Sequence, residues 1–213
     1  MELTKYTHAT VVLERDGTTL VIDPGAFTPE AADLVRAATG VLVTHEHFDH
    51  FDVDAVRAGL EANPALVVRA PQSVVDQLGE HDGRVASVQA GDAFAVGPFS
   101  VRVFGEQHAV IHRDIPTIAN VGYLVDDTVF HPGDAYLVPG VPVPMLLVPT
   151  SGPWTHTAEA VDYVRAVAPE RAVQIHEAML SEMGQQSTAR FLGSDGLGPV
   201  PVTILASGES ITV

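Results

Sequence analysis

The sequence predicts an α/β fold, a four-layer αββα sandwich in which helices flank two mixed β-sheets. Short β-branched runs alternate with helical patterns along most of the chain. Strand patterns dominate each half, and an α/β sandwich with helices outside two mixed sheets fits this mixture. No repeat, low-complexity tract or linker divides the 213 residues, so we expect a single domain over residues 1–213.

In the first part of the chain, turn residues separate the apolar runs. The Asp16-Gly17 step is a strong hairpin signal, Asp23-Pro24-Gly25 stops the next strand, and Asp52 is an expected helix N-cap. The expected strands are 9–13, 18–22, 41–43 and 65–68, and the expected helices are 29–38, 52–60 and 71–78.

The second part continues the alternation and ends in two short strands. We expect strands at 85–88, 93–96, 99–104, 121–125, 128–130, 145–148 and 172–176, and a helix at 157–167. Residues 202–205 and 210–213 are expected to form a closing strand pair.

Composition limits the classes of partner. A formal net charge of −16 and a pI near 4.7 argue against binding a nucleic-acid backbone. No stretch approaches the ~20 apolar residues of a membrane-spanning helix, and the N-terminus lacks a signal-peptide pattern, so we expect a cytoplasmic protein. The chain has no cysteine, so any metal site must use His, Asp and Glu.

The stretch THEHFDHFD, residues 44–52, follows the apolar run 41–43 and carries three histidines and two aspartates. Imidazole nitrogens and carboxylate oxygens bind zinc and related ions. His45, His47, Asp49 and His50 cannot all reach one tetrahedral ion comfortably, but they can supply two adjacent ions. A solvated, histidine-rich turn is the competing interpretation, and the spacing directly after a buried strand disfavours it.

The remaining ligands of such a site must come from other strand ends. His108 follows the strand pattern 101–104, Asp134 follows 129–130 and His176 follows 173–175. Each of these residues alone would be interpreted as an ordinary loop residue. Because a ligand-type residue follows each of three further strand patterns, the metal hypothesis is strengthened.

His45-Glu46-His47-Phe48-Asp49-His50 resembles the signature of the metallo-β-lactamase superfamily. Asp23-Pro24-Gly25 is similar to the aspartate loop of that family, and Phe130-His131-Pro132-Gly133-Asp134 to its Gly-Asp element. The order of elements matches from Leu3 to Val213. The resemblance implies the αββα fold and a metal-dependent hydrolase.

The resemblance also implies the ligand sets. His45, His47 and His108 would hold the first metal, and Asp49, His50 and His176 the second, with Asp134 bridging the two. Asp23 would orient the motif loop through hydrogen bonds. His112 is an alternative to His108, which lies nearer the strand end.

A narrower resemblance is to the ascorbate-6-phosphate lactonase-like branch of the superfamily. It is carried by Tyr6 to Leu13 and by the loop Pro149 to Thr155, where Ser151 replaces a glycine of the branch. His8 could face the cleft or lie on the surface. Trp154, the only tryptophan, could wall a substrate pocket or simply pack.

These observations predict a hydrolase that uses a metal-bound hydroxide on a small ester, lactone or phosphodiester. Asp49 and Asp134 are the expected catalytic carboxylates. Two zinc ions are expected, with manganese or iron as alternatives. The rival hypotheses are an iron- or manganese-dependent redox protein and a non-catalytic metal-binding protein on the same fold.

Overall fold

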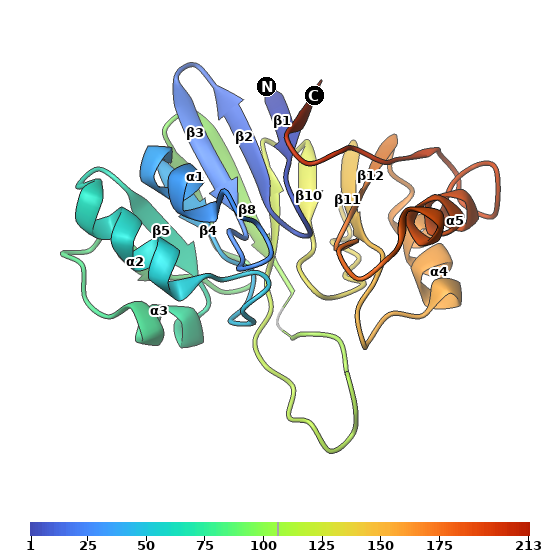
Figure 1. Ribbon diagram of the computed structural model, residues 1–213, viewed down its shortest axis with the longest axis horizontal. Coiled ribbons are helices and arrows are strands. Elements are labelled where there is room, and N and C mark those ends of the chain that lie inside the picture. The colour runs from blue at the N-terminus through green and yellow to red at the C-terminus, as the bar shows by residue number, and fades with distance from the viewer. Residues whose placement is uncertain (106) are drawn as a thin grey trace.

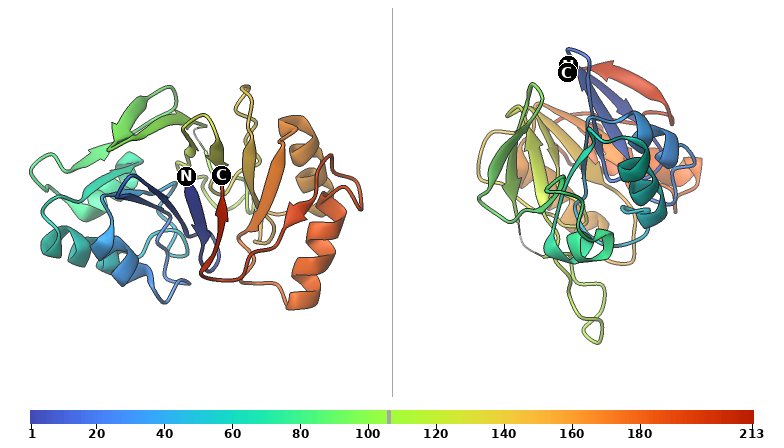
Figure 2. Two further views of the ribbon diagram at one scale, coloured as in Figure 1. Left: turned by 90° about the horizontal axis from the view of Figure 1, so that it is seen from above. Right: turned by 90° about the vertical axis from the view of Figure 1, so that its left-hand side faces the viewer.

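The computed structural model describes residues 1–105 and 107–213, and in it two mixed sheets pack face to face between outer helices (Figures 1 and 2). One sheet has the strand order β14-β1-β2-β3-β4-β5-β6, and the other has the order β13-β12-β11-β10-β9-β8-β7. In each sheet, three consecutive pairings are parallel, β3 to β6 in the first and β10 to β13 in the second. The predicted four-layer sandwich is confirmed.

The first sheet contains β1 (Glu2–Lys5), β2 (Val11–Arg15), β3 (Thr18–Ile22), β4 (Gly40–Leu42), β5 (Val67–Ala70), β6 (Val85–Ser87) and β14 (Glu209–Thr212). The second contains β7 (Ala93–Val96), β8 (Phe99–Phe104), β9 (Gly122–Val125), β10 (Val129–His131), β11 (Met145–Pro149), β12 (Arg171–Ile175) and β13 (Val202–Thr203). The helices are α1 (Ala31–Ala37), α2 (Val53–Ala62), α3 (Gln72–Leu78), α4 (Thr157–Val167) and α5 (Glu182–Leu192). The Asp52 side chain caps α2 as expected, by accepting hydrogen bonds from the N–H groups of Asp54 and Ala55.

Three apolar layers hold the four structural layers together. Residues such as Leu13, Leu20 and Phe99 fill the space between the sheets. A second cluster joins the first sheet to α1, α2 and α3, and a third joins the second sheet to α4 and α5. The strands at the centre are therefore buried on both faces, which explains their nearly continuous apolar runs.

The closing strand pair was predicted wrongly. β13 pairs in parallel with β12, whereas β14 pairs antiparallel with β1 in the other sheet. The prediction failed because it began the first strand at residue 9 and so omitted β1, whose free edge receives β14. The Thr4 and Ser210 hydroxyl oxygens lie 2.8 Å apart across this pairing, close to the two chain ends (Figure 1).

One further element, α5, had not been predicted. It buries only Ala189 and Leu192 and so shows a weak apolar stripe. In the part of the chain that the structure describes, no helix has the length and apolar character needed to cross a lipid bilayer.

Candidate metal centre

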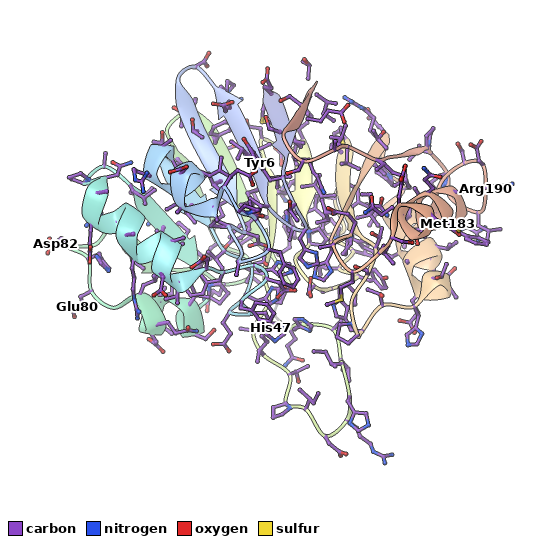
Figure 3. All side chains as sticks on the ribbon, viewed as in Figure 1. Tyr6, His47, Glu80, Asp82, Met183 and Arg190 are labelled. Carbon is purple, nitrogen blue, oxygen red and sulfur yellow. The ribbon has the colours of Figure 1, made fainter. Side chains whose placement is uncertain are left out.

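The predicted ligands come together at one end of the two sheets, where several strands end. The loop between β4 and α2 supplies His45, His47, Asp49 and His50. His108 follows β8, Asp134 follows β10 and His176 follows β12. Figure 3 shows His47 at this end of the sheets, beside the segment 107–119 that extends away from the body of the molecule.

Two groups of side chains offer metal-ligand atoms that all lie within 4.8 Å of one another. The first, here called the His47 group, contains His45, His47, His108 and Asp134. The second, here called the His8 group, contains His8, Asp49, His50 and His176. His112 is exposed and belongs to neither group, so the structure places His108 in the cluster instead.

The Asp134 carboxylate lies between the two groups. Its Oδ1 is 3.0 Å from His50 Nε2 and 3.1 Å from His176 Nε2, both in the His8 group. Its Oδ2 is 3.3 Å from His108 Nε2 in the His47 group. Asp134 thus contacts histidines of both groups.

Buried polar atoms without a hydrogen-bond partner among the described residues converge here. They are the Nε2 atoms of His45, His50, His108 and His176, together with Asp134 Oδ1. Unpartnered buried nitrogen and oxygen atoms are costly, and they are uncommon in native structures. A set of nitrogens and carboxylate oxygens pointing at one another is the donor set that zinc, manganese or iron would satisfy.

The other ring nitrogen determines which tautomer each histidine adopts. His50 Nδ1 lies 2.6 Å from Asp23 Oδ2, and His108 Nδ1 lies 2.6 Å from the Ala109 carbonyl oxygen. Because the Thr44 hydroxyl donates to Asp23, its oxygen is left to accept from His45 Nδ1 at 3.0 Å. When only Nδ1 carries a proton, each of these rings has a lone pair on Nε2, which is the form in which histidines bind a metal.

Asp23 is fully buried and is hydrogen-bonded to the loop of residues 44–52, which carries His45, His47, Asp49 and His50. Its carboxylate accepts hydrogen bonds from the Thr44 backbone N–H and hydroxyl, both at 2.7 Å, and from His50. Gly25 lets the two loops approach, because a Cβ there would lie 1.8 Å from the Asp49 carbonyl oxygen. Asp23 thus makes hydrogen bonds to Thr44 and His50, and its orienting role stays a prediction.

His8 has the opposite tautomer. Its Nδ1 accepts a hydrogen bond from the Ala178 N–H at 3.3 Å, so the proton is on Nε2, which lies 3.2 Å from Asp49 Oδ2. His8 is fully buried and its ring lies 3.7 Å from that of His176, centroid to centroid. This arrangement suits a residue that orients Asp49 rather than one that offers a lone pair to a metal.

Neighbouring charges shift the pKa values of His50 and Asp49 at this site. Burial alone would lower the pKa of His50, but Asp134 and Asp23 raise it well above its usual value. Burial opposes ionisation of Asp49 too, yet the hydrogen bond from His8 and the charge of His50 bring its pKa down to about 2. Carboxylates that retain a proton on a buried histidine also favour a bound cation.

Trp154 is buried and donates its indole N–H to Asp134 Oδ2 at 2.9 Å. It lies in the loop after β11 and also lines a hollow next to the cluster. Trp154 is therefore packed against the cluster and also borders a hollow, and its role as the wall of a substrate pocket stays a prediction.

Several residues of the site had not been identified from the sequence. Asn120 accepts the Asp134 N–H at 3.0 Å and donates to the Pro132 carbonyl at 3.0 Å, which fixes the loop that carries Asp134. Glu177 forms a buried ion pair with Lys5 and accepts the His8 N–H. Glu177 directly follows His176, and this adjacency was the one available signal; a lone Asn or Lys gives none.

Known proteins resemble the chain in sequence. The family model described as a beta-lactamase superfamily domain matches residues 2–176. Protein Rv0786c of Mycobacterium tuberculosis is 41% identical over 85% of this chain and 86% of its own length. A UPF0173 protein of Pyrococcus abyssi is 30% identical over 83% of each chain. A protein of Myxococcus xanthus named UPF0173 metal-dependent hydrolase is 26% identical over 82% of this chain and 70% of its own length.

The fold is also found in solved structures. Igni18, a metallo hydrolase from Ignicoccus hospitalis, superposes with a TM-score of 0.75 at 17% identity, covering 99% of this chain and 97% of its own. At that identity the likeness concerns the fold alone. The narrower resemblance to the ascorbate-6-phosphate lactonase-like branch stays a prediction.

Proposed function

Because the chain belongs to the beta-lactamase superfamily, we propose that its two side-chain groups hold two metal ions and hydrolyse a small ester, lactone or phosphodiester. The observation that carries the proposal is the convergence of unpartnered Nε2 atoms on the Asp134 carboxylate. Relatives named metal-dependent hydrolases support the same reaction type.

His45, His47 and His108 would hold one ion and Asp49, His50 and His176 the other, with Asp134 shared. Bound divalent ions supply Lewis acidity and a lowered pKa for water at this position. Zinc is the proposed metal, and the same nitrogen and oxygen donors also suit manganese and iron.

Asp134 and Asp49 have different roles in this proposal. Asp134 is engaged by Trp154 and by three histidines, and its side chain is 4% exposed. Asp49 is 12% exposed and is ionised at neutral pH, because its pKa is about 2. Asp49 is therefore the better placed of the two to accept a hydrogen bond from the attacking water.

In the hydrolysis of an ester, the water oxygen bonds to the acyl carbon and the bond to the leaving oxygen breaks. The leaving group takes up one proton, and the acid product loses another to solvent at neutral pH. His8 keeps Asp49 aligned through its Nε2–H, and Asp23 keeps His50 aligned through its carboxylate.

Metal analysis and activity together test the proposal. Purified protein should contain close to two equivalents of a transition metal and should hydrolyse members of a panel of esters, lactones and phosphodiesters. The double variant Asp49→Ala/His176→Ala should lose metal and activity while remaining folded by circular dichroism. His112→Ala is the matched control, since His112 is exposed and lies outside both groups. Full activity of the double variant, or an active protein free of metal, would refute the proposal.

A further inference from the structure

A hollow of about 360 Å³ adjoins the metal-binding cluster, within the size range of small-ligand pockets. Two of its lining residues contact Asp134 directly. Trp154 donates to the Asp134 carboxylate, and the Ala109 N–H donates to the Asp134 carbonyl oxygen at 2.8 Å. A substrate group in this hollow would therefore lie beside the carboxylate that the two groups share.

The inner wall of the hollow is aromatic. Trp154 and Tyr136 line it, with ring centroids 5.0 Å apart. Tyr136 is supported from behind by Tyr163, whose ring stacks on it at 5.2 Å. The segment 109–111 also lines the hollow and contributes Val110 and Ile111.

A second, much smaller hollow shares the lining residues Ala109 and Ile111 with the first. It is bounded by His47 and His108 together with apolar residues that include Ile111, Ile115 and Ile118. Val110 is 65% exposed and Ile115 is 50% exposed, so the segment that borders the site offers apolar surface to whatever binds there.

No lysine or arginine lines either hollow among the residues that the structure describes. Apart from the Tyr136 hydroxyl, the ionisable groups of the larger one are His156 and Glu159, both exposed. Arg113 lies farther along the projecting segment and is 3.9 Å from Asp114. Recognition of phosphate or carboxylate usually relies on arginine or lysine, and the chain as a whole carries a net charge of −16.

We infer that this site takes an uncharged substrate whose apolar or aromatic group binds between the Trp154–Tyr136 wall and the segment 109–111. The inference rests on the proposed function and narrows its substrate class. The scissile bond lies at the metals, and the remainder of the molecule carries no anionic group. A phosphorylated or carboxylated remainder would meet the negative charge of Glu159, and no lysine or arginine lines the hollow to compensate it.

Two esters that differ in one terminal group test the charge preference. These are 4-nitrophenyl butyrate and 4-nitrophenyl hemisuccinate, which share the leaving group and chain length but end in a methyl or a carboxylate. With metal-loaded wild-type protein, kcat/KM should be at least about 10-fold higher for the butyrate, mainly through a lower KM. Lengthening from acetate to butyrate should raise kcat/KM by up to about fourfold per methylene.

A charge reversal at Glu159 tests whether the remainder of the substrate binds in this hollow. Glu159→Lys should reduce the preference for the butyrate about 10-fold or more. Asp162→Lys is the matched control: the same exposed charge on α4 is reversed, but Asp162 does not line the hollow, and the preference should stay within about twofold.

The outcomes separate the two proposals. If metal-loaded protein hydrolyses neither these esters, nor bis(4-nitrophenyl) phosphate, nor any member of the lactone panel, the proposed function fails, and this inference fails with it. If it hydrolyses them but prefers the hemisuccinate or the phosphodiester, the inference alone fails. It also fails if Glu159→Lys and Asp162→Lys shift the preference equally.

Discussion

The two side-chain groups that meet at Asp134 differ in how firmly the chain holds them. In the His8 group, the His8 ring contacts the His176 ring at a tilt of 45°, its Nε2 lies 3.2 Å from Asp49 Oδ2, and its Nδ1 accepts the Ala178 N–H. In the His47 group, His47 is partly exposed and lines the smaller hollow, which Ala109 and Ile111 also line. We interpret the His8 group as a rigid support, and we expect a substrate to approach on the side of the His47 group.

The largest expected effect comes from the residue that both groups share. Asp134→Asn keeps the shape of the side chain but removes the charge that faces His50, His176 and His108. We expect activity to fall by more than the ~100-fold that loss of an outer hydrogen-bond partner typically costs. Metal content should fall in both groups, because each loses a ligand.

Metal analysis and steady-state kinetics on the same preparation check this prediction. If Asp134→Asn retains two equivalents of metal and activity within tenfold of the wild type, Asp134 is not shared by the two groups.

The next effect concerns the His8 group alone. The Lys5–Glu177 ion pair is buried, and Glu177 also accepts the His8 N–H. Burial lowers the pKa of Lys5 more than the attraction of Glu177 raises it. Glu177→Gln leaves that ammonium without its partner, so the free energy of unfolding should fall by about 3 kcal/mol.

Urea unfolding measures the loss, and the chain offers a matched control. The Arg36–Asp33 pair is exposed, so Asp33→Asn should change stability by less than about 0.5 kcal/mol. The double variant Lys5→Met/Glu177→Met should recover part of the loss, because it buries no unpaired charge. Equal effects of Glu177→Gln and Asp33→Asn would contradict the rigid-support interpretation.

The contrast between the groups also explains what the sequence could reveal. His45, His47, Asp49 and His50 are consecutive enough to form a recognisable pattern, and their strand makes their common location predictable. The position of Lys5 beside Glu177 depends on packing between residues 172 positions apart, which no local pattern encodes. The tautomer of His8 depends in the same way on the Ala178 N–H, which meets it only in the folded chain.

The fold shows the same limit. Runs of buried strands such as β3, β4 and β11 were predicted because their apolar residues are continuous. The pairing of β14 with β1 was not, since two short strands close in sequence resemble a hairpin whichever sheet they join. Local patterns identify elements, whereas long-range partners are determined by which edge is free.

A smaller effect, common to both groups, is expected at Asp23. Its carboxylate orients His50 directly and His45 through Thr44. Asp23 has a φ of 51°, a conformation that asparagine tolerates, so Asp23→Asn changes the charge with little backbone strain. Metal affinity should fall about 10- to 100-fold.

Competition with a chromophoric chelator measures that affinity. Asp16→Asn is the control, because Asp16 has the same φ of 51° but an exposed side chain outside both groups. An unchanged affinity in Asp23→Asn would show that the loop is held without this carboxylate.

The smallest expected effect is the contribution of Asp49 to the pH dependence of stability, measured in protein stripped of metal. Because the folded-state pKa of Asp49 is about 2, below its unfolded value of 3.8, the unfolded state binds more protons between these values. The stabilisation is therefore complete above about pH 4 and is lost as the pH falls toward 2. Partial contact of Asp49 with solvent screens the effect, leaving on the order of 0.5–1 kcal/mol between pH 5 and pH 3. Urea unfolding at these two pH values should show a larger loss for the wild type than for Asp49→Asn, and equal losses would mean that His8 does not hold Asp49 as its ionised partner.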